Sequence, residues 1–298
     1  MLAQCTETWN SLPLWGKVAV GAGGVVLAGA TLKNVYGVSQ THESGIICKN
    51  WKNDVVYLYQ FPRSPYLPNA SPFCLKLETF LRYAKIDYEV IGSMNHWSKE
   101  GKLPFIELNG VQYHDSDFAM EMLVDHFKLD HLEADLTDEQ RGMTRAMFKL
   151  AEQSLCEAMI YNRFLENMDG FFKAMGFSVN FLQRAIVGRF LTKKIRARVN
   201  GAGIGRHSRE EIYLIAKADL EAFSLLLGDN EYFFGNKPHT VDIIVWSVLC
   251  QSYYMPFDNL IRTYIITHFT NLDAFITRMK EHFWPDWDQM LLKKPVKI

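Results

Sequence analysis

The chain has 298 residues, of which 32 are Lys or Arg and 33 are Asp or Glu, so its net charge is −1. This balance argues against a general nucleic-acid binder, and no nucleic-acid partner is expected. Hydrophobic residues make up 48% of the chain and charged residues 22%, which is typical of globular domains. The five cysteines are widely separated and form no CxxC pair, and the nine histidines show no metal-binding spacing. We therefore predict reduced thiols, no disulfide framework and no metal site.

Residues 1–38 form an amino-terminal segment with a candidate membrane anchor at about 15–36. Val18 to Leu32 carries no charge, and Trp15 and Tyr36 flank it. At ~1.5 Å per helical residue, the two aromatic rings would lie roughly 30 Å apart, which is the thickness of a bilayer core. The segment therefore predicts an uncleaved hydrophobic helix in contact with the lipid bilayer.

Two other interpretations of this segment stay open. Ala28-Gly29-Ala30 has the small-x-small form of a signal-peptidase site, which would make the segment a cleaved signal. A buried glycine-rich helix is the second alternative. If the helix is an anchor, the single pass places the following domains in the cytosol, because lysines are more frequent after the apolar stretch than before it. The organelle is open, with lysosomal and mitochondrial outer membranes among the candidates.

Residues 39–53 resemble a linker, and residues 54–130 an α/β domain. Val55 to Phe61 is apolar, β-branched and aromatic, which predicts a buried strand. Ser71 is a candidate N-cap for a helix that begins at Pro72. The remaining elements are a strand over Asp87–Ile91, a hairpin of Leu103–Leu108 and Val111–His114 around Asn109-Gly110, and a helix over Ser116–Phe127. This order is thioredoxin-like, with a parallel first pair of strands and an antiparallel hairpin.

Residues 137–290 are predicted to form an all-helical domain, followed by a tail at 291–298. Strand patterns are absent from this region, and its apolar periodicity is that of helices. The predicted elements are Asp138–Asn167, Phe171–Arg198, Arg209–Leu227 capped by Ser208, a connection over Gly201–Arg206, a helix opening at Thr240 with His239 at the cap position, and a segment Phe283–Trp287 that packs back on the domain. The fold class is therefore α/β plus all-α, preceded by the amino-terminal hydrophobic helix.

The element order, the SPFC turn and the GKLPFIELNG stretch followed by HDSDF resemble the amino-terminal domain of glutathione transferases. The resemblance implies that Ser71 or Cys74 activates the thiol of glutathione and that a cis Leu103–Pro104 bond aligns the glutathione backbone. It also implies that Asp115–Ser116 holds the γ-glutamyl end. The N-terminus of a helix stabilises a thiolate or a carboxylate, which agrees with these roles.

Each of these residues also has a purely structural interpretation. Ser71 and Asp115–Ser116 would then serve only as helix caps, Cys74 would be a packing residue, and Pro104 would determine the fold. The thiol-activating tyrosine of many transferases is absent, and the position that would complete a redox CxxC with Cys74 holds a serine.

Four longer blocks resemble a narrower group, the failed axon connections family, which includes nematode cadmium-responsive proteins and is related to the metaxins. The blocks are YQFPRSPYLPNASPFCLKLETFLRYAKIDYE, GKLPFIELNG, GAGIGRHSREEIYLIAKADL and EHFWPDW, and the resemblance extends over roughly residues 54–290. It implies a two-domain, glutathione-transferase-like body on a membrane anchor. It also implies a link to axon development in insects and to cadmium response in nematodes.

Together these features predict a membrane-anchored, glutathione-transferase-like protein that acts in stress or cadmium response or in detoxification by binding glutathione. The alternative is a non-catalytic scaffold or adaptor in axon development or at an organelle membrane. A homodimer or a protein partner is expected from the fold class. Enzymatic activity and its substrate are open at this stage.

Overall fold

A four-stranded sheet forms the centre of the first domain in this computed structural model, which describes residues 45–176 and 181–293. Its strands are β1 (Val56–Gln60), β2 (Tyr88–Gly92), β3 (Phe105–Leu108) and β4 (Val111–His114), in the spatial order β2-β1-β3-β4. β1 pairs parallel with β2 and antiparallel with β3, which pairs antiparallel with β4. The predicted thioredoxin-like order and hairpin are confirmed. The hairpin turn has positive φ at both Asn109 and Gly110, as a two-residue turn of this type requires.

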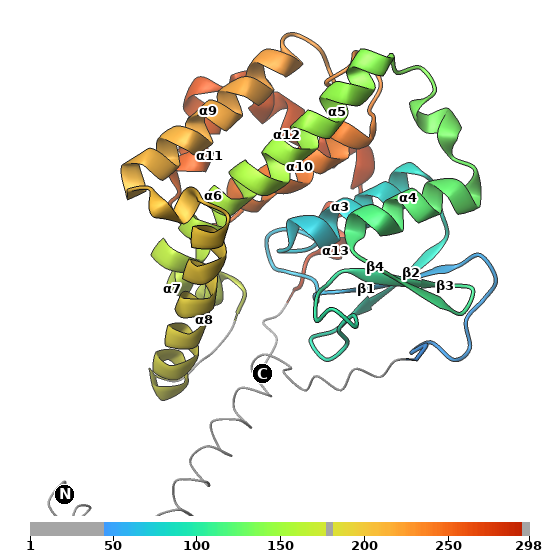
Figure 1. The fold of residues 1–298 in the computed structure, drawn as a ribbon, viewed down its shortest axis with the longest axis horizontal. Helices are drawn as coiled ribbons and strands as arrows, with labels where there is room; N and C mark the ends of the chain where they lie inside the picture. Colours follow the sequence, from blue (N-terminus) through green and yellow to red (C-terminus); the bar gives the residue numbers. More distant parts are fainter. Residues whose placement is uncertain (1–44, 177–180, 294–298) are drawn as a thin grey trace, which may run out of the picture. The chain divides into compact units, whose positions relative to one another are not determined.

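Two helices, α3 (Pro72–Tyr83) and α4 (Ser116–Phe127), cover one face of the sheet (Figure 1). They bury an apolar layer against it, formed by Val56, Leu58, Leu77, Phe80, Leu81, Ile106, Leu108, Ala119, Met120 and Leu123. On the opposite face, Tyr59 and Phe105 pack with partly buried residues, including Ile47 and Trp97. The N–H groups of Ile47 and Cys48 donate to the buried carboxylate of Glu107 at 2.7 and 2.9 Å. Contacts with the sheet therefore begin inside the predicted linker.

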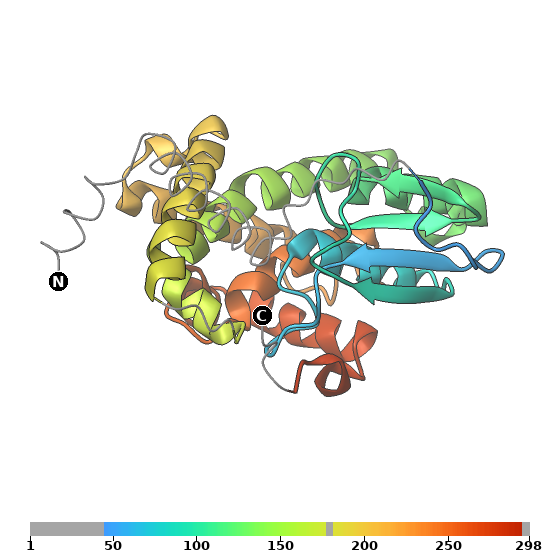
Figure 2. The same cartoon turned by 90° about the horizontal axis from the view of Figure 1, so that it is seen from below.

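The rest of the described chain is helical, as the sequence predicts (Figure 2). The elements are a 3₁₀ turn η1 (Asp130–Glu133), α5 (Asp138–Leu150), a π-helical turn η2 (Ala151–Leu155), α6 (Cys156–Tyr161), a π-helical turn η3 (Asn162–Glu166), α7 (Met168–Ala174), α8 (Phe181–Gly201), a 3₁₀ turn η4 (Ile204–Arg206), α9 (Arg209–Leu227), α10 (Thr240–Tyr253), α11 (Leu260–His268), α12 (Thr270–Phe283) and α13 (Trp287–Met290).

Two helical predictions need correction. The segment predicted over Asp138–Asn167 is one continuous helical run, but two π-helical turns interrupt its α-helical hydrogen bonding. The segment predicted over Phe171–Arg198 divides into α7 and α8, because α7 ends at Ala174 and α8 begins at Phe181. The caps Ser208 and His239 stand where the sequence places them, and the Asp242 carboxylate accepts the His239 N–H at 2.8 Å.

One apolar core joins the helical domain to the first domain. α10 is buried on all sides over Val241–Ser252 and packs against α3, whose Leu75 belongs to the core of the helical domain. The segment Phe283–Trp287 packs back as predicted, and it also reaches the first domain. There the buried Trp284 indole N–H donates to Thr79 Oγ1 at 3.0 Å. Because the two domains share this core, they pack as one folded body.

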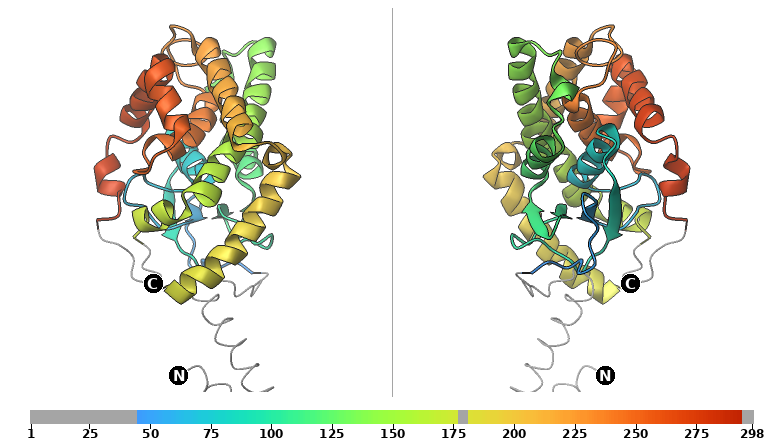
Figure 3. Two further views of the ribbon diagram at one scale, coloured as in Figure 1. Left: turned by 90° about the vertical axis from the view of Figure 1, so that its left-hand side faces the viewer. Right: turned by 90° about the vertical axis from the view of Figure 1, so that its right-hand side faces the viewer.

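Helix α8 extends away from the other helices of its domain, and its amino-terminal end lies furthest from them (Figure 3). Among the described residues, no helix combines the length and the apolar character needed to cross a membrane. The predicted anchor at 15–36 lies outside the described residues.

Candidate functional site

The predicted site segments meet at one edge of the sheet. β1 leads directly into the loop that precedes α3. The register pairs Tyr59 with Phe105, and Phe105 with His114. Phe105 follows Leu103–Pro104 and His114 precedes Asp115–Ser116. Both segments therefore lie beside the end of β1 and the start of α3.

Ser71 is the N-cap of α3, and its side chain is half-buried. Its Oγ accepts the N–H of Cys74 at 3.4 Å, and Pro72 occupies the first helical position, where the missing N–H costs nothing. The Ser71 hydroxyl thus stands at the amino end of a twelve-residue helix. The free N–H groups and the dipole of such a helix end favour a nearby anion.

Cys74 lies in the first turn of the same helix, but its side chain is fully buried. It packs among Tyr59, Leu103 and Phe105. Burial raises the pKa of the Cys74 thiol to about 12, and hydrogen bonds with the Phe61 backbone and the Ser71 side chain offset this only in part. The thiol is therefore protonated at neutral pH and lacks the thiolate character of a reactive cysteine.

The peptide bond Leu103–Pro104 is cis, as the resemblance implies. Leu103 is buried, and Pro104 leads into β3. Outside the helices and the sheet, the backbone hydrogen bonds of the described residues do not involve Leu103. Its N–H and C=O therefore have no backbone partner in the part of the chain that the structure describes, which suits pairing with the backbone of a peptide-like ligand.

Asp115–Ser116 begins α4. Asp115 has φ of 69°, a conformation that non-glycine residues rarely adopt, and its carboxylate accepts the N–H of Asp117 at 2.8 Å. Ser116 is 5% exposed, and its hydroxyl has no hydrogen-bond partner among the described residues. A serine hydroxyl without a partner among these residues, at the start of a helix, is suited to an anionic ligand group.

A buried lysine lies behind this helix start. Lys76 of α3 is fully buried, and its ammonium group pairs with Asp117 and with Glu152 of η2, the latter at 2.6 Å. Burial raises the pKa of Glu152, while the charge of Lys76 lowers it. This triad joins both domains next to the predicted site. The sequence did not predict this triad, because a lysine within a helix is normally expected to face solvent.

The helical domain also holds the loop that presents Ser71. The guanidinium of the buried Arg163 donates to the Ala70 carbonyl at 2.6 Å and to the Gln251 side-chain oxygen at 3.0 Å. Gln251 donates to the Asn69 carbonyl at 3.2 Å, and Asn69 Oδ1 accepts the Ser71 N–H at 3.0 Å. Burial lowers the pKa of Arg163 to about 10, so the group stays charged at neutral pH. Residues of both domains therefore hold the loop that carries Ser71 in position.

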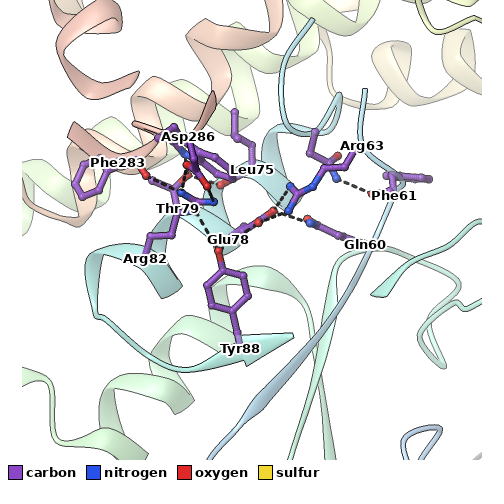
Figure 4. A network of polar contacts seen from close by, with 12 residues as sticks. Gln60, Phe61, Arg63, Leu75, Glu78, Thr79, Arg82, Tyr88, Phe283 and Asp286 are labelled. Atoms are coloured by element: carbon purple, nitrogen blue, oxygen red, sulfur yellow. Dashed lines mark hydrogen bonds and ion pairs between the residues drawn. The ribbon is translucent and has the colours of Figure 1, made fainter. Parts of the chain in front are cut away.

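A second network fixes the other end of this loop (Figure 4). The buried Glu78 carboxylate accepts from both terminal nitrogens of Arg63, at 2.7 and 2.6 Å, and from Gln60 at 2.6 Å. Arg82, one turn further along α3, makes a bidentate pair with Asp286 at 2.6 and 3.0 Å. The carboxyl-terminal segment and β1 are thus both attached to the helix that starts at Ser71.

Two histidines near the site escaped the sequence reasoning. His114 ends β4, immediately before Asp115, and His96 stacks edge-on against Tyr59. Each has a buried Nδ1 without a partner among the described residues, and burial lowers the pKa of His114. The loop of His96 also holds Trp97, whose indole N–H donates to the Met94 carbonyl at 2.8 Å. The histidines therefore have unused polar capacity beside the site, whereas the Trp97 donor is already paired.

A cavity of about 240 Å³ opens elsewhere, between α4 and α5. The lining combines apolar residues with charges of both signs: Phe80, Asp117, Met120, Glu121, Val124, Arg141, Thr144, Arg145, Phe148, Thr240 and Ile244. None of the six predicted site residues lines it, although Asp117 directly follows Ser116 at the start of α4.

Comparison with known proteins agrees with this geometry. Residues 72–169 match the glutathione S-transferase N-terminal domain, and residues 216–279 match the glutathione S-transferase C-terminal domain. The protein named Failed axon connections from Drosophila melanogaster is 37% identical over 262 residues, which cover 82% of this chain and 62% of that protein. The chain is thus similar in sequence to the failed axon connections protein, as the motif blocks predict. Its relationship to the metaxins and to glutathione transferases, expected from the motifs, is confirmed.

More distant relatives include a glutathione S-transferase and a metaxin. An isoprene-epoxide–glutathione S-transferase from Rhodococcus is 27% identical over an alignment that covers 77% of this chain and 99% of that protein. Mouse Metaxin-2 is 19% identical over 80% of this chain and 91% of its own length. A glutathione transferase structure from Phanerochaete chrysosporium has a TM-score of 0.52 at 14% identity, covering 76% of this chain and 97% of that one. This last likeness concerns the fold alone. The chain spans about 62% of the Drosophila protein's length.

Proposed function

We propose that this relative of the failed axon connections protein binds glutathione at the sheet edge. The observation that carries the proposal is the meeting of three features there: the cis Leu103–Pro104 segment, the unpartnered Ser116 hydroxyl at the start of α4, and Ser71 at the start of α3. In this proposal, Ser116 and the N–H groups of α4 receive the γ-glutamyl carboxylate. The Leu103 backbone pairs with the cysteinyl backbone, and the amino end of α3 faces the sulfur.

We further propose that Ser71, rather than Cys74, is the group that meets the glutathione sulfur. The Ser71 hydroxyl is half-buried, and it can donate a hydrogen bond to a thiolate that the amino end of α3 already favours. The buried, protonated Cys74 cannot contribute a thiolate at neutral pH. The name of the Rhodococcus relative supports an epoxide as the electrophile to try first.

Turnover of glutathione with an epoxide tests the catalytic form of the proposal. The thiolate attacks an epoxide carbon, a C–S bond forms, and the opened oxygen takes a proton. We expect the Ser71→Ala variant to lose at least tenfold in kcat/KM, since one activating hydrogen bond is removed. Cys74→Ala, measured beside it as the control, should keep the rate. Equal rates in Ser71→Ala and in the unsubstituted chain would reject the role of Ser71.

A non-catalytic scaffold that retains the glutathione site is the second candidate. The specific observation in its favour is the fully buried Cys74, which leaves the first turn of α3 without a reactive thiol. Saturable glutathione binding without turnover of epoxides or disulfides would favour this candidate. A second copy of the chain or another protein would then be the functional partner.

The cellular part of the proposal follows from the family and from the sequence. We propose that residues 15–36 anchor the protein in a membrane, that the folded body faces the cytosol, and that the protein acts in cadmium response or in axon development. Extraction tests the anchor: alkaline carbonate should leave an integral protein in the membrane pellet, and release into the supernatant would reject it.

A further inference from the structure

Helix α8 has an unusual charge composition. It carries six cations and no acidic residue: Arg184, Arg189, Lys193, Lys194, Arg196 and Arg198. Arg198 pairs with the nearly buried Glu157 of α6 at 2.6 Å, which attaches the carboxyl end of the helix to the domain. Arg189, Lys193, Lys194 and Arg196 are exposed, and no ion pair involves them among the described residues. Four cations are therefore exposed and have no counter-charge among the described residues.

These cations share one face of the helix with an exposed aromatic ring. At about 100° per residue, Arg189, Lys193 and Arg196 lie within about 60° of one another, and Phe190 and Lys194 lie roughly 60° and 100° further round, so the whole set spans about 160° of the helix. Phe190 is 56% exposed. The opposite face packs on the domain, since Val199 is buried and Ile195 contacts the core. We call the exposed set, Arg189, Phe190, Lys193, Lys194 and Arg196, the basic face of α8.

The basic face is separate from the glutathione-transferase features of the chain. The two family matches cover residues 72–169 and 216–279, and α8 lies between them. α8 also extends away from the helices around it (Figures 1 and 3). The helix contains none of the candidate site residues. Its charge pattern therefore calls for an explanation other than the glutathione site.

We propose that the basic face of α8 docks on an anionic lipid surface. Positive charges on one face of a helix complement anionic headgroups, and a phenyl ring among them can enter the boundary between headgroups and acyl chains. A nucleic-acid partner fits less well, because the whole chain carries a net charge of −1. The inference rests on the proposed membrane association, because an anchor at residues 15–36 would hold the chain at a lipid surface.

Vesicle flotation and hydrogen exchange of the full chain test this docking. The protein is prepared with vesicles of phosphatidylcholine alone and of phosphatidylcholine with added phosphatidylserine. We expect the α8 amides to exchange at least tenfold more slowly on the anionic vesicles than on the neutral ones. The protection should fall with added salt, which screens headgroup attraction.

Charge reversal at Arg189→Glu/Lys193→Glu should abolish this difference. The matched control is Arg145→Glu/Arg262→Glu, which makes the same change of charge at exposed positions on α5 and α11. The control should keep the protection, and circular dichroism verifies that both variants are folded. Equal α8 exchange on the two lipids, whether slow or fast, would overturn the proposal. Loss of protection in the control would overturn it too.

The flotation results separate this proposal from the anchor. Flotation with both lipids and unprotected α8 would leave the anchor standing and reject the docking. Flotation only with anionic vesicles, lost on charge reversal, would support the docking and reject the anchor. Absence of flotation with either lipid would reject both. Protection of α8 by an added oligonucleotide but by neither vesicle would assign the basic face to nucleic acid and overturn the proposal.

Discussion

At the residue scale, burial decides the chemistry of side chains that the sequence places side by side. Ser71 and Cys74 occupy the same turn, yet the hydroxyl is half-buried and the thiol is fully enclosed. The sequence places both at the helix start. It cannot say which one points at the sheet, because that depends on how the preceding loop enters the helix. The buried charges of Lys76 and Arg163 escaped prediction for a related reason, since their partners come from distant segments.

Asp219 of α9 offers a test of such burial. It is 7% exposed, its Oδ2 has no hydrogen-bond partner among the described residues, and burial raises its pKa to about 6. The carboxyl is thus less readily ionised in the folded than in the unfolded chain. The folded chain favours the protonated carboxyl, so the contribution of this group to the unfolding free energy is fully present below pH ~4. It is lost as pH rises through about 6.

We expect Asp219→Asn to be more stable than the unsubstituted chain at pH 8, by roughly 2–3 kcal/mol, and to lose this advantage at pH 4. Denaturant unfolding at the two pH values measures the difference. Glu221→Gln, at an exposed position on the same helix, is the control and should show no such pH dependence. An advantage that is equal at both pH values would contradict the burial argument.

At the scale of elements, strand register brings the site together. The pairs Tyr59–Phe105 and Phe105–His114 place three loops at one edge of the sheet. The Asn109-Gly110 turn predicts the pairing of Leu103–Leu108 with Val111–His114, so the sequence could locate Leu103–Pro104 and Asp115–Ser116 together at one end of that hairpin. The loop before α3 was less predictable, because Arg163 of the helical domain helps to hold its conformation in addition to hydrogen bonds within the loop, such as that between Ser71 and Asn69.

Arg163→Lys tests this positioning from a distance. Lysine keeps the charge but cannot bond the Ala70 carbonyl and Gln251 at once. We expect a loss of about 2–4 kcal/mol in unfolding free energy and at least tenfold weaker glutathione binding, because Ser71 is no longer held in place. Arg209→Lys, at an exposed position, is the control. Unchanged glutathione affinity in a destabilised Arg163→Lys would show that Arg163 supports the fold alone.

At the scale of the whole molecule, the domains behave as one unit because their cores merge. Leu75 of α3 is fully buried in the core of the helical domain, whereas Leu81 of the same helix is buried against the sheet. The division into an α/β and an all-helical domain was predictable from the periodicity. Their shared core was not, because periodicity shows that a helix face is buried but not what covers it.

A shared core predicts a single unfolding transition. Leu75→Ala and Leu81→Ala should each lower the unfolding free energy by about 2–5 kcal/mol. Each should shift the transition equally whether it is followed by tryptophan fluorescence or by far-ultraviolet circular dichroism. Two separate transitions, with Leu81→Ala moving only the earlier one, would show instead that the domains unfold independently.

Calorimetric titration of glutathione into the full chain, beside Ser116→Ala, tests the proposed glutathione site at the edge of the sheet. In this site the Ser116 hydroxyl, which has no hydrogen-bond partner among the described residues, binds the γ-glutamyl carboxylate. We predict saturable binding that weakens about tenfold or more in Ser116→Ala, since a hydrogen bond to a charged group is worth about 1.5–3 kcal/mol. Absence of binding heat in the folded protein at several temperatures, or equal affinity in the variant, would contradict the account.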